Sequence, residues 1–165
     1  MPKTLREFSS GGVVFKKENN QTLWLIARTA PSEIFPNTVW RLPKGWIDDA
    51  GPGIPGPIAS GKVKADEESL QKSALREVGE EGGVDAKIIK KIDSIKYFYN
   101  FPGKGNILKF VTFYLMEWEK DLPEGFDDET SEIAWLPYDK AYETLSFGRE
   151  KDVLQMANDL LTKLN

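Results

Sequence analysis

The sequence predicts an α+β fold in which a mixed β-sheet lies between helices. Strand-like runs occur before, between and after two helical segments, an order typical of a sheet with helices on its faces. The chain has 165 residues, of which 40% are apolar, so it is long enough to bury one core and leaves little room for a second. We therefore expect residues 1–165 to form a single domain.

The first two elements are expected to form a β-hairpin. The apolar runs 8–15 and 23–27 are separated by the polar segment 16–21, which has the composition of a turn. A loop with two prolines then leads to the run 38–42.

Residues 49–66 are rich in glycine and proline. Seven of these residues are one or the other, which favours a loop over a helix or strand. Because too few residues precede this segment to make a separate core, we interpret it as a surface insertion within one domain.

A helix is predicted from residue 67 onward. Leu70, Ala74 and Val78 recur at four-residue spacing, which places them on one face of a helix. Asp66 is suited to cap its N-terminus, and Gly82-Gly83 is suited to end it.

Four strands and a second helix are predicted after this helix. The strand-like runs are 84–92, 94–100, 108–118 and 132–136, with a glycine-containing turn at 102–106. From about Arg149 the apolar spacing again becomes helical.

The composition excludes several kinds of chemistry. The chain contains no cysteine and no histidine, so thiolate nucleophiles, zinc–thiolate sites and imidazole bases are absent. A metal site made only of carboxylates favours hard ions such as Mg²⁺ or Mn²⁺. A net charge of −4 argues against general nucleic-acid binding. No apolar run is long enough for a membrane span and no secretory signal is visible, so we expect a cytoplasmic protein.

Carboxylates crowd the C-terminal half of the first predicted helix. Glu80 and Glu81 lie three and four residues after Glu77, so these carboxylates crowd one side of the helix. Like charges at that spacing destabilise a helix unless a cation compensates them. Arg76 stands four residues before Glu80 and can pair with it. By itself the cluster is also compatible with a solvated acidic face.

A longer pattern favours the functional interpretation. Glu68, seven intervening residues and then Arg-Glu-Val-Gly-Glu-Glu-Gly-Gly-Val match the end of the motif G-x5-E-x7-R-E-U-x-E-E-x-G-U, where U is aliphatic. This is the Nudix box, and the chain resembles a Nudix hydrolase over most of its length. Gly45, within Leu-Pro-Lys-Gly, is taken as the box glycine, although Glu68 then lies 17 residues later than the motif places it.

The resemblance implies a Nudix-type α/β/α sandwich and a Mg²⁺- or Mn²⁺-dependent pyrophosphohydrolase. It implies metal ligands at Glu77, Glu80 and Glu81, with catalytic roles for the last two. It also implies that the backbone carbonyl of Lys44 completes the metal site, and that Glu68 and Arg76 orient the ligands. The number of metal ions, the general base and the oligomeric state stay open.

A further carboxylate is expected from a distant loop. The stretch from Glu129 to Leu136 is similar to the corresponding stretch of diadenosine tetraphosphate hydrolases, which implies that Glu129 is a metal ligand or base. A solvated acidic turn is an equally good interpretation of that residue.

The same resemblance suggests where a nucleotide polyphosphate substrate binds. Arg41 and Lys44 are candidates for phosphate contact, and Tyr97, Tyr99 and Phe147 for contact with a base. Ordinary surface charge and core packing are the respective alternatives. The glycine- and proline-rich insertion, which follows the box glycine, is hypothesised to shape the entrance.

Diadenosine tetraphosphate and related dinucleoside polyphosphates are the substrates that the resemblance favours. The alternatives are RNA 5′ ends, diphosphoinositol polyphosphates, oxidised nucleoside triphosphates and nucleotide sugars. A non-catalytic ligand-binding module is a third class, but such a module is expected to have lost acidic box positions, and all are occupied here.

Overall fold

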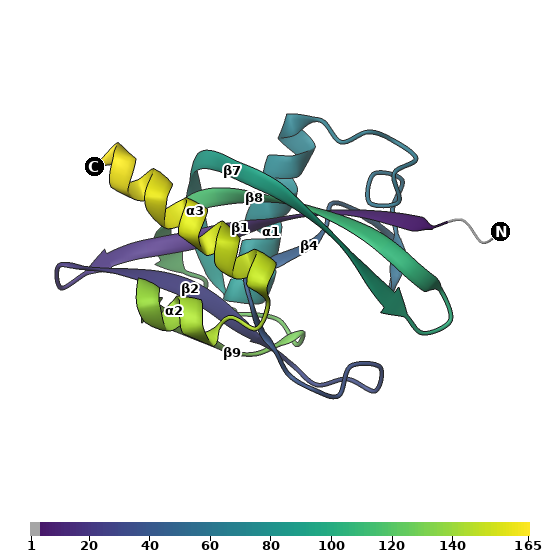
Figure 1. Cartoon of the computed structure of the whole chain (residues 1–165), viewed down its shortest axis with the longest axis horizontal. Helices are drawn as coiled ribbons and strands as arrows, with labels where there is room; N and C mark the ends of the chain where they lie inside the picture. The colour runs from purple at the N-terminus through teal and green to yellow at the C-terminus, as the bar shows by residue number, and fades with distance from the viewer. Residues whose placement is uncertain (1–3) are drawn as a thin grey trace.

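A computed structural model describes residues 4–165 of the chain (Figure 1). Its strands are β1 (Leu5–Glu18), β2 (Gln21–Thr29), β3 (Trp40–Arg41), β4 (Lys44–Trp46), β5 (Asp49–Gly51), β6 (Ile54–Pro55), β7 (Val84–Phe101), β8 (Gly105–Asp121) and β9 (Thr130–Pro137). Its helices are α1 (Glu67–Gly82), α2 (Tyr138–Thr144) and α3 (Gly148–Leu164). Within the described residues, no helix combines the length and hydrophobicity that a membrane span requires.

Seven strands form one mixed sheet. Their order is β3-β2-β1-β8-β7, with β4 paired to β1 and β9 paired to β2. The pairing of β1 with β8 is parallel, whereas β1 runs antiparallel to both β2 and β4. The predicted α+β class with a mixed sheet is confirmed.

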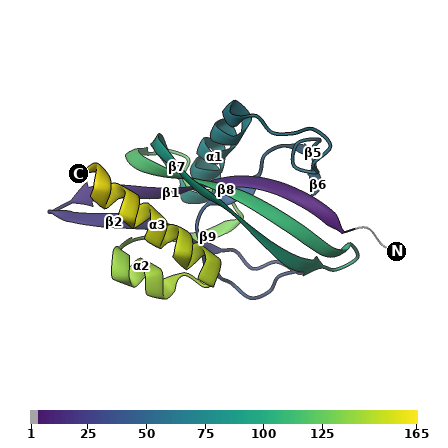
Figure 2. The same ribbon diagram turned by 45° about the horizontal axis from the view of Figure 1, so that its top comes forward.

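The helices cover opposite faces of the sheet (Figure 2). Successive residues of β1 point to opposite faces, so Val13 joins the core beneath α3 and Val14 joins the core beneath α1. The α1 side contributes Ala74 and Val78, the helical face that the sequence predicts. Val153 of α3 packs in the other core. Because both faces are covered, the strands are apolar on both sides.

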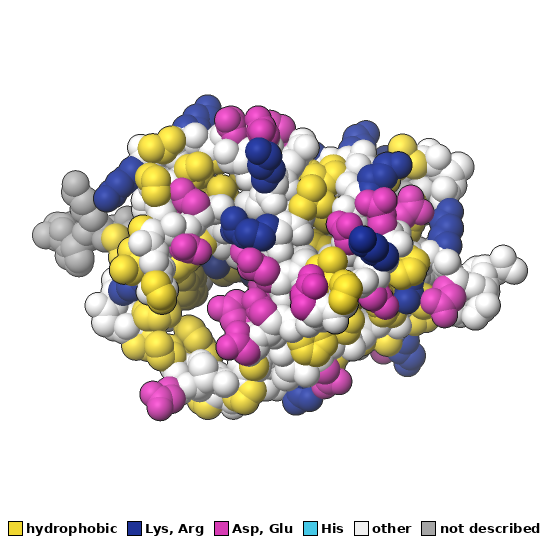
Figure 3. All heavy atoms as spheres, turned by 180° about the vertical axis from the view of Figure 1, so that it is seen from behind, with side chains coloured by type: hydrophobic (Ala, Val, Ile, Leu, Met, Phe, Trp, Pro, Cys, Tyr) yellow, Lys and Arg dark blue, Asp and Glu magenta, His cyan; other side chains and the backbone are white. Residues whose placement is uncertain are grey.

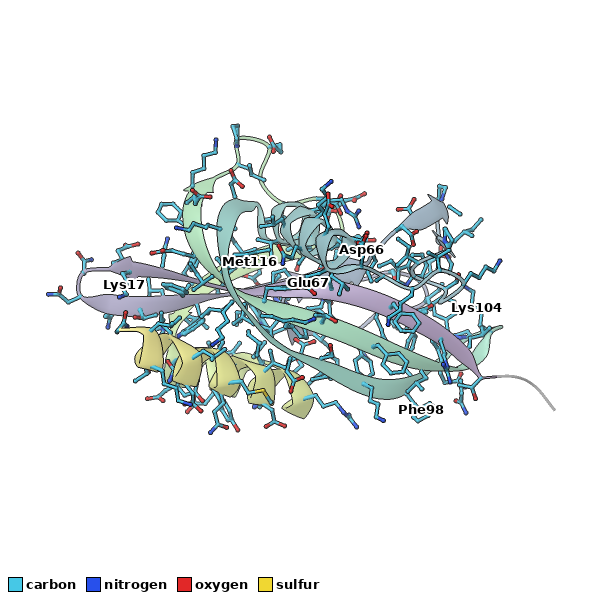
Figure 4. The ribbon with its side chains drawn as sticks, turned by 90° about the horizontal axis from the view of Figure 1, so that it is seen from above. Lys17, Asp66, Glu67, Phe98, Lys104 and Met116 are labelled. Carbon is cyan, nitrogen blue, oxygen red and sulfur yellow. The ribbon has the colours of Figure 1, made fainter. Side chains whose placement is uncertain are left out.

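Both ends of α1 follow from the sequence. The Asp66 carboxylate accepts the Ser69 N–H at 2.8 Å and satisfies one free donor of the first turn (Figure 4). Gly83 ends the helix in the left-handed conformation, with φ of 71°, and its N–H donates to the Gly79 carbonyl. The predicted helix and its caps are confirmed.

The strand predictions are partly wrong between residues 84 and 100. The structure has one continuous strand, β7, where the sequence suggested two. Irregularities in its pairing with β8 occur between Ile88 and Lys90 and between Lys91 and Asp93. Such bulges shift the alternation of side chains without ending the strand, which is why the pattern appeared to break. The sequence also missed α2, a seven-residue helix in which only Ala141 is buried.

The glycine- and proline-rich segment is anchored to the sheet. It contains the short antiparallel pair β5–β6, which the sequence did not predict. The Asp48 carboxylate accepts N–H groups of Ile58 and Ala59, and the Ala59 carbonyl accepts the N–H of Phe8 on β1. The segment is therefore an ordered insertion, and its suggested role at the entrance stays a prediction.

Candidate active site

Three glutamates of the last turns of α1 lie beside β4. Because Ala74 and Val78 face the sheet, Glu77 and Glu81 project from the neighbouring side of the helix into a buried position, while Glu80 is half exposed. Two carboxylates without water around them are costly unless cations or donors compensate their charge. The fold therefore concentrates carboxyl groups at one place.

Glu81 is held from two directions. Arg41 Nη2 donates to its Oε2 at 3.0 Å, and the Lys44 backbone N–H donates to its Oε1 at 3.3 Å. Burial nevertheless raises the pKa of Glu81 to about 8, against the opposing effect of Arg41. The side chain is therefore ready to release a proton when a second cation approaches.

Glu77 packs directly on Gly45. A Cβ added at Gly45 would lie 2.2 Å from the Glu77 Oε2, so only glycine leaves room for this carboxylate. Burial and the neighbouring Glu80 raise the pKa of Glu77 to about 7, although Arg76 Nη2 lies 3.2 Å from its Oε1. This contact explains the glycine of the motif and supports Gly45 as its position.

Glu129 is brought to the same end of α1. The Asp127 N–H donates to the Glu80 carbonyl at 2.7 Å, and the Thr130 hydroxyl donates to the Glu81 carbonyl at 2.9 Å. The charge of Glu129 contributes to the raised pKa of all three glutamates of the cluster. The loop residue proposed from the sequence therefore lies beside the helix residues.

Arg76 joins the helix to the strand opposite. Its Nη2 donates to the Trp46 carbonyl at 2.8 Å, and its Nε lies 3.7 Å from Glu80 Oε1. The expected pair with Glu80 is thus present, and the same guanidinium fixes the end of β4. Arg76 is placed to orient the carboxylates.

Glu68 lies away from this cluster. Its side chain is 73% exposed and pairs with Lys72 at 2.9 Å. Glu77 lies nine positions further along the chain, which is about 13 Å along a helix at 1.5 Å per residue. The structure therefore does not bring Glu68 to the ligands that the resemblance implied it would orient.

The side chains fit a hard divalent cation by their chemistry. Glu77, Glu80, Glu81, Glu129 and the Lys44 carbonyl offer only oxygen donors, which suits Mg²⁺ or Mn²⁺. Within residues 4–165, however, no three carboxylates converge closely enough to enclose an ion. Two of these glutamates are paired with arginines instead, Glu81 with Arg41 at 3.0 Å and Glu77 with Arg76 at 3.2 Å.

The raised pKa values predict that the metal-free protein loses stability as the pH rises. Between the ordinary glutamate value near 4.5 and the folded values of about 7 and 8, the folded state holds more protons than the unfolded state. The free energy of unfolding therefore falls from pH 5 to 8 in chelator, and added Mg²⁺ restores more of it at pH 8 than at pH 5. Thermal unfolding at several pH values, with and without Mg²⁺, measures both effects. Equal stability at pH 5 and 8 in chelator would contradict this expectation.

The sequence suggested that the Lys44 side chain is exposed and contacts phosphate, but in the structure it is buried. Its ammonium is buried and donates to Glu150 Oε2 at 2.5 Å, with the Tyr97 ring 5.4 Å away. Burial lowers the pKa of Lys44, but Glu150 and Tyr97 together outweigh that effect and raise it. The side chain is engaged inside the protein, while its backbone faces Glu81.

The tyrosines form a row on the α3 side of the sheet. The rings of Tyr97 and Tyr99 lie 6.4 Å apart, and the Tyr99 hydroxyl donates to Glu7 at 2.7 Å. Phe98 points the other way and is exposed (Figure 4), as strand alternation predicts. Phe147 lies immediately before α3 with 46% of its surface exposed. Tyr97 belongs partly to the core, so Tyr99 and Phe147 are the more accessible candidates for a base.

Lys109 is a cation that the sequence analysis missed. Within the described residues it has no salt-bridge partner, and it lies over the Tyr99 ring at 5.9 Å. Burial, together with the like charges of Lys44 and Arg41, lowers its pKa to about 8. A lysine on the same face of β8 as the buried Val111 and Phe113 was the available signal. It supplies positive charge that an anionic ligand can neutralise.

Seen from behind, the space-filling view shows a hollow in the surface of the protein (Figure 3). Hydrophobic side chains line one side of it and acidic side chains gather on the other (Figure 3). A hollow with an apolar wall and a few charged groups is typical of a small-molecule site.

The comparison with family models decides the assignment. Residues 8–156 match the model of the NUDIX domain. The chain belongs to the Nudix family. The match includes α1, β4 and the strands that carry the aromatic row.

Three of the individual proteins that match this chain are 17–26% identical to it. The mutator protein MutT4 of Mycobacterium tuberculosis (strain CDC 1551 / Oshkosh) is 26% identical over 98% of this chain, which spans 58% of that protein's length. Among solved structures, a C. elegans Ap4A hydrolase in a binary complex has a TM-score of 0.61 and 18% identity, over 95% of this chain and 98% of that one. The NUDIX domain of Shewanella oneidensis NrtR with ADP ribose has a TM-score of 0.60 and 17% identity, over 94% of this chain and 88% of that one. These structures share the Nudix fold with this chain.

Proposed function

We propose that this Nudix protein hydrolyses a phosphoanhydride bond of a dinucleoside polyphosphate such as diadenosine tetraphosphate, with Mg²⁺ or Mn²⁺ as cofactor. The observation that carries this proposal is the meeting of the α1 carboxylates with the cation Lys109 and an aromatic row in one region of the structure. Anhydride hydrolysis needs that combination, because it requires a cation site, phosphate contacts and a place for the base.

The carboxylates are proposed to have two roles, which are to hold the cation and to accept a proton from the attacking water. Glu77 and Glu81, with the Lys44 carbonyl, would hold the divalent cation, which would neutralise phosphate oxygens and lower the pKa of a bound water. Glu80 is the most exposed of the three glutamates and Glu129 lies on the loop beside it, so these two are placed to accept the proton of the attacking water. Arg76 holds Glu77 and Glu80 in position.

The substrate is proposed to bind along the α3 side of the sheet. Lys109 contacts the phosphates, and Arg41 joins it when the cation takes over Glu81. Tyr97 and Tyr99 on β7, and Phe147 immediately before α3, offer ring faces for bases. Two separate aromatic positions suit a substrate that has two nucleosides.

One observation favours a second candidate. The relative with 26% identity is named a mutator protein, which points toward a nucleoside triphosphate, such as the oxidised nucleoside triphosphates considered above. Such a substrate has one base and uses only one of the two aromatic positions.

A substrate panel separates these candidates. With Mg²⁺ present, we expect diadenosine tetraphosphate to give a kcat/KM at least about fivefold higher than oxidised nucleoside triphosphates, capped RNA or nucleotide sugars, since a second stacked base adds about 1 kcal/mol or more. Water adds across one anhydride of diadenosine tetraphosphate. Cleavage of either outer anhydride yields AMP and ATP in equal amounts, whereas cleavage of the central one yields two ADP, and we expect the first outcome. Chromatography of the products measures both. A preference for the triphosphates would replace the first candidate with the second.

A further inference from the structure

Four hydrogen bonds join the start of α3 and the residues just before it to the segment that contains β3 and β4. The proposed hydrolysis assigns no role to these bonds. Trp40 and Ser146 exchange two of them, at 2.9 Å from the Trp40 N–H to the Ser146 hydroxyl and at 3.0 Å from the Ser146 N–H to the Trp40 carbonyl. Glu150 accepts the other two. The Leu42 N–H donates to its Oε1 at 2.6 Å and the Lys44 ammonium to its Oε2 at 2.5 Å.

Glu150 is an unusual residue for a helix that covers a core. Its side chain is 2% exposed, and Lys44, its counter-ion, is also buried. A buried ion pair adds little net stability over apolar residues of the same size, because both charges lose their water. What such a pair does supply is a defined position for the groups that it contacts.

The segment that Glu150 contacts also contacts the glutamates of α1. The backbone N–H of Lys44 donates to Glu81, and Gly45, the next residue, packs against Glu77. On the other side, the Gly12 N–H of β1 donates to the Pro43 carbonyl at 3.1 Å. The segment from Leu42 to Gly45 is therefore fixed by β1 at one side and by Glu150 at the other.

We propose that Glu150 is a positioning residue for the metal site. By holding the Leu42 N–H and the Lys44 ammonium, it sets where the Lys44 backbone lies, and so where the Lys44 carbonyl and Glu81 present their oxygens. The inference rests on the proposed role of that carbonyl as a ligand. Glu150 touches neither substrate nor metal.

Titration of the metal-free protein with Mn²⁺ alone, followed by calorimetry, tests this role. Glu150→Gln keeps an acceptor for the Leu42 N–H and removes the charge that holds Lys44. We expect the Kd for Mn²⁺ to rise about tenfold, because the loss of a residue that orients ligands weakens metal sites by 10- to 100-fold. Glu150→Ala removes both contacts and is expected to raise the Kd further.

Activity on the preferred substrate gives a second readout. In Glu150→Gln we expect kcat to fall about tenfold while KM changes less than about threefold, because the Trp40–Ser146 bonds still hold Phe147 in place. Asp152→Asn, an exposed neutralisation on the same helix, is the matched control and is expected to leave Kd and kcat unchanged.

A double variant distinguishes an effect of Glu150 on the stability of the protein from its effect on the position of the metal ligands. In Glu150→Gln/Lys44→Met both members of the buried pair are neutral, so neither position leaves an unpaired charge and the unfolding temperature is expected to lie close to that of the wild type. Its Kd for Mn²⁺ is expected to stay raised. If both folded variants bind Mn²⁺ with the wild-type Kd and keep kcat, Glu150 has a structural role alone and the inference is overturned. Because the titration contains no nucleotide, its outcome is independent of which substrate is correct.

Discussion

Glu81→Gln is expected to lower kcat about 1,000-fold while the protein stays folded, since loss of a preorganised electrostatic group costs rates of this order. The pKa of Glu81 is about 8 in the metal-free protein, so at pH 7 its carboxyl is mostly neutral and glutamine resembles it. Glutamine also keeps an acceptor for the Lys44 N–H. The variant therefore loses the negative charge that would bind a divalent cation, and it keeps the size of the side chain and its hydrogen-bond acceptor. Steady-state kinetics and thermal unfolding measure the two effects.

Glu80→Gln is expected to give a comparable loss, because the more exposed carboxylate beside it is the one placed to activate water. The matched control is Glu143→Gln on α2, an exposed glutamate whose partner is Lys140. Wild-type rates in either Glu80→Gln or Glu81→Gln would reject the assignment of the site.

Gly45→Ala is expected to abolish most metal binding without unfolding the protein. The added methyl group would lie 2.2 Å from Glu77 Oε2, and the end of a flexible side chain can move away at little cost to the fold. Glu77 is then pushed out of the cluster, so we expect the Kd for Mn²⁺ to rise and kcat to fall by about 100-fold. Calorimetric titration with Mn²⁺ and thermal unfolding measure these effects.

Gly148→Ala provides the control for this substitution. Gly148 has no neighbouring atom within 4 Å of an added Cβ, so the same chemical change is expected to leave metal binding intact. If Gly45→Ala binds Mn²⁺ as tightly as the wild type, Glu77 does not belong to the site.

The helix that carries the glutamates was predictable because its signals are local. The four-residue spacing of Ala74 and Val78, the Asp66 cap and Gly83 all act within one element, and the structure confirms each. The metal-ligand assignment itself came from the resemblance to the Nudix box, since three glutamates on a helix, taken alone, favour a solvated acidic face. The family match confirms the resemblance, and the ligand roles stay predictions.

What the sequence could not show depends on contacts between distant segments. Glu150 lies 106 residues after Lys44, and no spacing rule connects a glutamate on the last helix to a lysine before the first. The lysine was therefore interpreted as free to reach phosphate, whereas the fold occupies its ammonium. For Glu68 the motif suggested a role in orienting the metal ligands. Its exposed position on α1, where it pairs with Lys72, does not support that role.

The proposed hydrolysis depends most on where the divalent cation binds. Anomalous diffraction from a crystal soaked in Mn²⁺ tests it directly, because the scattering of manganese marks the ion independently of the protein atoms. We expect an anomalous peak bounded by Glu77, Glu81 and the Lys44 carbonyl, with Arg41 released from Glu81. A peak elsewhere, or none at this position in a protein that still hydrolyses its substrate in excess chelator, would contradict the account.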